Sequence, residues 1–186
     1  MATAVKEHGG LDVVIHATAI MQKVGPVATL DPDDWDRVMK MNAKGAFLLS
    51  RSALAELTRP GGRIVFTGSV TGLSGQPYTA AYSASKGALR AFTQSLALEV
   101  AAEGITVNGV APAHVEAAMN LAALEKAVHE TGRSIDELRA ERDAGIPVRR
   151  QATAEEIARA MQYLASPAAS YVTGTWLDIN GGVLLR

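Results

Sequence analysis

The sequence predicts an α/β fold, in which helices cover both faces of a parallel sheet of about four strands. Short apolar segments rich in β-branched residues alternate along the chain with longer segments of helical periodicity, which is the order of strand–helix–strand units. Right-handed crossovers would place such strands in one parallel sheet. The chain has no internal repeat and no shift of composition that would mark a linker, so we expect one domain over residues 1–186.

Four segments have the length and composition of buried strands. Each is too short for a helix and is bounded by Gly or Pro residues or by polar residues. In a parallel sheet such segments are normally covered on both faces. The predicted strands are residues 11–17 (LDVVIHA), 63–67 (RIVFT), 105–110 (ITVNGV) and 175–179 (TWLDI).

Helical periodicity and end signals predict two long helices and one shorter one. Asp31 supplies an N-cap and Pro32 a preorganised first position for the first helix, and Gly104 ends the second. Thr153 and Glu156 form a capping-box sequence at the start of the third. These helices cover residues 32–58, 79–103 and 153–164; residues 1–8 would end a further helix, and residues 115–143 would form two short helices over a cleft.

Composition restricts the class of ligand. The 18 basic and 19 acidic residues leave a formal net charge of −1, which gives no electrostatic footprint for nucleic acid or an anionic membrane. The chain has no cysteine, which excludes disulfides and thiolate metal sites. No segment approaches the roughly 20 apolar residues of a membrane span. We therefore expect a cytoplasmic protein with a small-molecule ligand, no metal, and no nucleic-acid or membrane partner.

The stretch SVTGLSGQPYTAAYSASK, residues 69–86, carries the strongest chemical signal. Tyr82 and Lys86 are four residues apart on a predicted helix, so their side chains share a face. A nearby ammonium lowers the pKa of a phenol from about 10 and makes it a general acid or base. Ser69 ends a strand at the sheet edge where ligands bind, and could hold a substrate oxygen. The alternative is an exposed helix pair without function.

The motifs in order resemble those of the short-chain dehydrogenase/reductase family, over nearly the whole chain. The matching segments are LDVVIHATAI, MNAKGAFLLSR, GGRIVFTGSVTG, AAYSASKGAL, GITVNGVAPAHV and VTGTWLDINGG, and Ser69 precedes Tyr82 by the family's thirteen residues. The resemblance implies a Rossmann-like fold and an NAD- or NADP-dependent oxidoreductase that interconverts a small alcohol and a carbonyl. Tyr82 would be its general acid/base.

The family's functional residues map onto positions of this chain. The resemblance implies Asn42, Ser69, Tyr82 and Lys86 as catalytic residues, with Asn42 supporting a proton relay to Lys86. Asn42 could instead simply cap or kink its helix. The implied cofactor contacts are Ala17, Ala19, Tyr82, Lys86, Pro112, Ala113 and Val115, and the candidate substrate-lining residues are Ser69, His114 and Glu116, beside a variable substrate-loop region at 115–150. The family also implies a homodimer or homotetramer formed through helices 32–58 and 79–103.

The chain departs from the family in the part that binds the cofactor. Family members begin with a strand, a Gly-rich turn and a helix that hold the pyrophosphate, whereas this chain starts at about the helix before the fourth strand. Ala19 adds a Cβ where the family has glycine, and Ala113 and Ala117 replace a glycine and a threonine. We expect an N-terminally shortened reductase whose strand 11–17 forms an open sheet edge. The alternative is a catalytically impaired remnant that acts as an oligomerisation or binding module.

Overall fold

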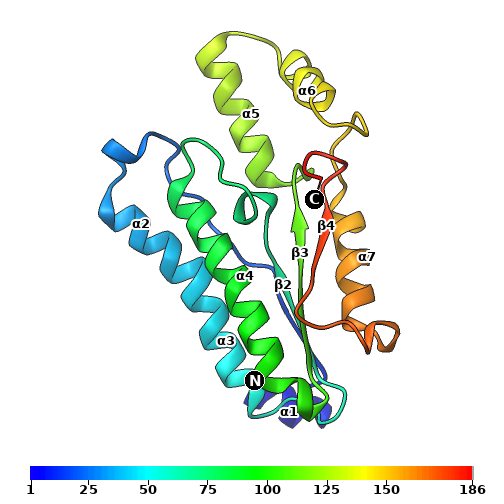
Figure 1. The fold of residues 1–186 in the computed structure, drawn as a ribbon. Coiled ribbons are helices and arrows are strands. Elements are labelled where there is room, and N and C mark those ends of the chain that lie inside the picture. The colour runs from blue at the N-terminus through cyan, green and yellow to red at the C-terminus, as the bar shows by residue number, and fades with distance from the viewer. Residues whose placement is uncertain (186) are drawn as a thin grey trace.

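The computed structural model describes residues 1–185, apart from the side chains of residues 2, 118–120 and 122–123. Its sheet has four strands, all parallel, in the order β1-β2-β3-β4 (Figure 1). The strands are β1 (Val13–His16), β2 (Arg63–Thr67), β3 (Thr106–Pro112) and β4 (Trp176–Ile179). The α/β class, the parallel sheet and the number of strands predicted from the sequence are confirmed.

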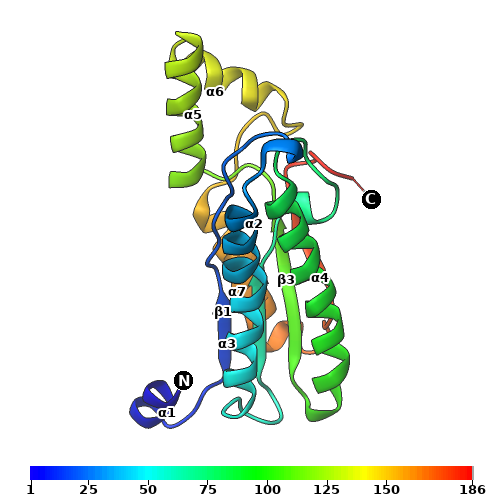
Figure 2. The same ribbon diagram turned by 90° about the vertical axis from the view of Figure 1, so that its left-hand side faces the viewer.

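Helices cover both faces of this sheet (Figures 1 and 2). On one face lie α2 (Pro32–Met39), α3 (Gly45–Leu54) and α4 (Ala80–Val100), and on the other lies α7 (Ala154–Ala165). The short α1 (Ala2–His8) lies at the amino-terminal end of the strands. Beyond their carboxyl ends stand α5 (Ala118–Thr131) and α6 (Ile135–Ala144), where two short helices were predicted. None of the described helices is long and apolar enough to cross a membrane.

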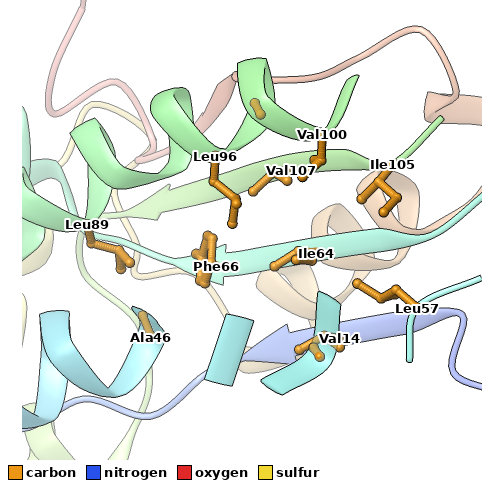
Figure 3. Close-up of a cluster of buried hydrophobic side chains, with 12 residues drawn as sticks. Val14, Ala46, Leu57, Ile64, Phe66, Leu89, Leu96, Val100, Ile105 and Val107 are labelled. Carbon is orange, nitrogen blue, oxygen red and sulfur yellow. The ribbon is translucent and has the colours of Figure 1, made fainter. Parts of the chain in front are cut away.

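The larger of two hydrophobic clusters lies between the sheet and the helices α3 and α4 (Figure 3). Four of its members are completely buried: Ile64 and Phe66 of β2, Val107 of β3 and Leu89 of α4. The opposite faces of the same strands bury Val65 and Val110 against α7. Because β2 and β3 are covered on both faces, their sequences consist almost entirely of apolar residues.

The edge strand β1 differs from this expectation. It was predicted to be covered on both faces, but its burial alternates: Val14 and His16 are buried, whereas Val13 is 37% and Ile15 47% exposed. Within the described residues β1 pairs only with β2, so its other backbone edge is open. The open edge was predicted correctly. The burial of both faces was not, because α7 lies over β2 and β3 and leaves β1 uncovered.

The first long helix is interrupted. The sequence predicts one helix over 32–58, but α2 and α3 are joined by a π-helical segment, η2 (Lys40–Lys44), and α3 ends at Leu54. A π segment inserts an extra residue in a turn and is often found at functional sites. Its buried residue is Asn42. The predicted Asp31 N-cap, which accepts from the Asp33 backbone N–H at 3.0 Å, and the capping box of α7 are both present.

Candidate active site

Ser69 lies just beyond the carboxyl end of β2. It is the N-cap of the 3₁₀ helix η3 (Val70–Gly72). Its Oγ accepts hydrogen bonds from the Thr71 backbone N–H at 3.2 Å and from Thr71 Oγ1 at 3.0 Å. A serine hydroxyl has two acceptor sites and one proton to donate. With both acceptor sites used by Thr71, the Ser69 O–H is left to donate.

Tyr82 is the third residue of α4 and points toward Ser69. Its side chain is only 9% exposed, and the Ser69 side chain is close enough to its phenol to influence the phenol's pKa. Burial raises the pKa of Tyr82, and the Ser69 side chain lowers it by a smaller amount. The net effect raises the pKa of Tyr82, so the lowered pKa predicted from the sequence is wrong. The phenol therefore stays protonated at neutral pH.

Lys86 lies one turn further along α4 and is 1% exposed. Its Nζ donates to the Thr67 carbonyl oxygen at 2.7 Å and lies 5.6 Å from the centroid of the Tyr82 ring. Burial lowers the pKa of Lys86 to about 8, so the ammonium form predominates at pH 7. A Cβ on Gly72 would meet the Lys86 backbone at 2.7 Å. The loop after β2 therefore packs directly on this helical turn.

Asn42 connects the π segment to the loop after β1 and to α4. Its Oδ1 accepts from the Ile20 backbone N–H at 2.8 Å, and its Nδ2 donates to the Ile20 carbonyl at 2.9 Å. Nδ2 also donates to Ser85 Oγ at 3.0 Å. Asn42 is fully buried and both ends of its amide are used. The structure thus brings the four predicted catalytic residues onto one side of the sheet, at the carboxyl ends of β1 and β2.

Two structural features of the site were missed from the sequence. Gln22, in the loop after β1, is 4% exposed and bonds to the backbone of Tyr82. The Trp176 ring fills space over two glycines: a Cβ on Gly68 would lie 2.0 Å from it, and one on Gly109 would lie 2.6 Å from it. Trp176 also packs against the larger hydrophobic cluster. Nothing in the sequence near Gln22 signals its partner 60 residues away.

Comparisons with known proteins agree with this arrangement. The family model described as enoyl-(acyl carrier protein) reductase matches residues 1–184. The nodulation protein G of a Rhizobium species is 38% identical over 181 residues, which cover 95% of this chain and 67% of that protein. The chain belongs to the short-chain dehydrogenase/reductase family. The 3-oxoacyl-acyl-carrier-protein reductase of Vibrio cholerae is 36% identical over 96% of this chain and 69% of its own length.

Solved structures of the family share the fold. The actinorhodin polyketide ketoreductase with NADPH superposes with a TM-score of 0.89 at 32% identity, over 98% of this chain and 70% of that one. An NAD⁺-bound xylitol dehydrogenase superposes with a TM-score of 0.88 at 29% identity, over 97% of this chain and 72% of that one. The chain is thus of the short-chain dehydrogenase/reductase enzyme type and spans about two thirds of the length of these relatives.

The positions that the family resemblance assigns to the cofactor lie at the same sheet edge. Ala17 directly follows β1 and is exposed, and Ala19 is half-buried. Pro112 ends β3 and is buried, while Ala113 and Val115 are half-buried beyond it. Because β1, β2 and β3 are neighbours in the sheet, these two loops flank the loop that carries Ser69. Their roles in cofactor binding remain predictions.

His114 lies in the loop after β3 and is half-buried. Its carbonyl accepts from the Ala152 backbone N–H at 3.0 Å, which ties the loop after β3 to the segment before α7. His114 lines a cavity of about 180 Å³ together with Arg150, Glu156 and Asn180, among others, and neither Ser69 nor Tyr82 is among its lining residues. Burial, aided by Arg142, lowers the pKa of the His114 imidazole. Glu116 is exposed, and a substrate role for either residue remains a prediction.

Proposed function

We propose that this protein is an NAD(P)-dependent oxidoreductase that interconverts a small alcohol and a carbonyl. The observation that carries the proposal is the Ser69 hydroxyl acting on the buried Tyr82 phenol, whose pKa it lowers, with the Lys86 ammonium buried one helical turn away. A hydroxyl donor beside a protonated phenol can polarise a carbonyl oxygen and then protonate it. Ser69 would hold the oxygen, Tyr82 would donate the proton, and Lys86 would stabilise the phenolate that results.

The protonation states favour reduction of the carbonyl at neutral pH. Burial raises the pKa of Tyr82, so the phenol carries the proton that reduction consumes. The pKa of Lys86, about 8, leaves a positive charge near the oxygen from which that proton departs. Oxidation of an alcohol needs the phenolate at the start, which a buried phenol forms only at higher pH. We infer that turnover in the oxidative direction needs a more alkaline pH than reduction.

The described residues fit the nicotinamide half of a dinucleotide. Tyr82 and Lys86 would hold the nicotinamide ribose, and the loop from Pro112 to Val115 would lie against the nicotinamide. When bound, NADH or NADPH would supply the hydride. In the loop after β1, Ala19 carries a Cβ where the family has a glycine.

A binding experiment followed by a turnover experiment tests the proposal. Purified protein is titrated with NADH and with NADPH, and the fluorescence of each cofactor is recorded. Cofactor oxidation is then followed with ethyl acetoacetate, a small β-keto ester. This probe is chosen because one relative is named a 3-oxoacyl reductase. We expect binding of at least one cofactor and its oxidation by the ester. No binding of either cofactor at millimolar concentration would overturn the proposal.

The second candidate function is a non-catalytic oligomerisation or binding module. The open edge of β1, with Val13 and Ile15 exposed on one face, favours it, because such an edge invites another chain. Loss of turnover in Tyr82→Phe would exclude this alternative. Equal behaviour of Tyr82→Phe and the wild type in every assay would support it.

We also infer a homodimer or homotetramer formed through the two long helices, under either function. Trp35 and Phe47 on the first helix, with its π segment, and Leu98 on α4 are exposed and apolar, and burying such residues favours association. Light scattering that gives the mass of a monomer would refute the inference. A cytoplasmic location remains a prediction.

A further inference from the structure

Gln22 is a buried amide whose two ends both bind backbone groups near the catalytic tyrosine. It lies in the loop after β1 and is 4% exposed. Its Oε1 accepts from the Tyr82 backbone N–H at 2.9 Å, and its Nε2 donates to the Tyr78 carbonyl oxygen at 3.4 Å. One side chain thus spans the first turn of α4 and the loop that leads into it.

The first turn of α4 has no side-chain cap from its own N-cap residue. Gln22 takes over this capping role from a distant loop. The first N–H groups of any helix have no partner inside the helix. The N-cap residue Thr79 makes no side-chain cap bond, and the helical bonds begin with the Ser83 N–H, which donates to the Thr79 carbonyl at 2.9 Å. The Tyr82 N–H is therefore an orphan donor that would be buried without a partner. Gln22 supplies its acceptor from 60 residues away in sequence.

The other contact of Gln22 supports an unusual backbone conformation. Tyr78 has a φ of 66°, in the left-handed region that a residue with a large side chain rarely adopts. Its carbonyl accepts from Gln22 and also from the Gly25 backbone N–H at 3.1 Å. Strained backbone of this kind persists only where its surroundings hold it. The loop after β1 therefore fixes the direction from which the chain enters α4.

The carbonyl of Tyr82 is tied to the same loop by a second route. Ser85 Oγ donates to the Tyr82 carbonyl at 2.7 Å and accepts from Asn42, which in turn binds both backbone groups of Ile20. The backbone N–H and C=O of Tyr82 are thus connected, through Gln22 and through Asn42, to residues 20–22. A shift of this loop would move the tyrosine from both sides.

We propose that Gln22 is a positioning residue that aims the Tyr82 phenol at Ser69 by capping the first turn of α4. This inference rests on the proposed function for its effect on catalysis, but its structural part can be tested without turnover. Displacement of a catalytic group by about 1 Å can cost on the order of 10²-fold in rate. Loss of the cap would lower kcat and leave the KM for the carbonyl nearly unchanged, because Gln22 acts on the proton donor.

Two substitutions of Gln22 and one matched control test the proposal. Gln22→Met keeps the length of the side chain and removes both hydrogen bonds. Gln22→Glu keeps an acceptor for the Tyr82 N–H. Gln94→Met makes the same change at an exposed position of α4. For each protein we measure hydrogen exchange of the Tyr82 amide, the titration of the Tyr82 phenol by NMR with ¹³C-labelled tyrosine, and kcat and KM for ketone reduction.

In Gln22→Met we expect the Tyr82 amide to exchange about 10-fold faster or more, as the loss of one buried hydrogen bond implies. We expect kcat to fall at least about 10-fold with KM within about twofold of wild type. The pKa of Tyr82 should rise further, because the Ser69 contact that lowers it is weakened. Gln22→Glu should retain the amide protection and most of kcat, and Gln94→Met should match wild type.

The outcomes distinguish failure of the Gln22 positioning role from failure of the proposed oxidoreductase function. Wild-type kcat in Gln22→Met, or wild-type protection of the Tyr82 amide, would overturn the positioning role. If the wild-type protein oxidises neither cofactor, the proposed function fails, and the exchange and titration of Tyr82 judge Gln22 alone. In that case an unchanged amide and phenol in Gln22→Met would overturn the inference. If Gln22→Met does not fold, faster amide exchange in Gln22→Glu than in wild type would overturn it.

Discussion

The carboxyl end of β2 and the free edge of β1 belong to one sheet but are built in opposite ways. Around Ser69, Tyr82 and Lys86 the chain supplies its own partners: Thr71 donates to the Ser69 hydroxyl, and the 1%-exposed Lys86 donates to the Thr67 carbonyl. Along β1, Ile15 is 47% exposed and one backbone edge is open. The candidate proton-transfer site is thus held by contacts within the chain, whereas among the described residues one edge of β1 has no strand partner and Val13 and Ile15 are exposed.

This difference separates two requirements of the same reaction. In the proposed reaction, proton transfer needs a preorganised acid, for which β2 and α4 carry the candidate side chains Ser69, Tyr82 and Lys86. Hydride transfer would need a bound dinucleotide, which we propose to lie against the loop after β1, where Ala17 is exposed and Ala19 stands where the family has a glycine. Substitutions near Tyr82 should therefore have large effects on chemistry and on stability. Substitutions on the outer face of β1 should have almost no effect on either.

The largest effect is expected for Tyr82→Phe. Loss of the phenol removes the proton donor but keeps the packed ring, so we expect turnover of the carbonyl to fall by about 10³-fold, with cofactor binding unchanged. Tyr171→Phe, at a fully exposed tyrosine, is the control and should keep wild-type turnover. Steady-state kinetics and cofactor fluorescence measure both. Retention of more than about a tenth of the activity would show that another group supplies the proton.

The buried Lys86 should make stability depend on pH. Its pKa is about 8 in the folded protein and 10.5 as an ordinary lysine, so between these values the unfolded chain binds more protons and stability rises with pH. From pH 8 to 10 the free energy of unfolding of the wild type should rise by about 2 kcal/mol relative to Lys86→Met. Urea unfolding at several pH values measures this difference.

Lys126→Met is the matched control for the pH experiment, because Lys126 is an exposed lysine. It should keep the pH dependence of the wild type. Parallel curves for wild type and Lys86→Met over the same range would mean that Lys86 is hydrated in solution. The site around Tyr82 would then be more open than the structure indicates.

Gly68→Ala should destabilise the protein by about 2 kcal/mol. The added Cβ would lie 2.0 Å from the Trp176 ring, so the strand end that carries Ser69 or the ring must move. In a Trp176→Leu background the same change should cost less, because the ring is gone. Gly75→Ala, where a Cβ would meet no atom within 4 Å, is the control. Equal costs of Gly68→Ala in both backgrounds would contradict the close contact.

The sequence predicted local features well and long-range ones poorly. Strand composition, the Asp31 cap and the capping box at Thr153 are set by neighbours in sequence, and each is found in the structure. The four-residue spacing of Tyr82 and Lys86 placed both on one helix face. The Gln22 cap and the Trp176 ring over Gly68 depend on how distant segments meet, which no local pattern encodes. The direction of the Tyr82 pKa was missed because the depth of burial is also a property of the whole fold.

The smallest effect on stability is expected on the outer face of β1. Two neighbouring valines of this strand allow a direct comparison of its exposed and buried faces. Val13 is 37% and Val14 5% exposed, and they point to opposite faces of the strand. Val13→Thr should change the free energy of unfolding by no more than about 0.5 kcal/mol. Val14→Thr should cost about 1–3 kcal/mol, because it buries a hydroxyl among apolar side chains. Urea unfolding at low and high protein concentration measures both. An equal cost at the two positions, growing with protein concentration, would mean that another chain covers β1 in solution.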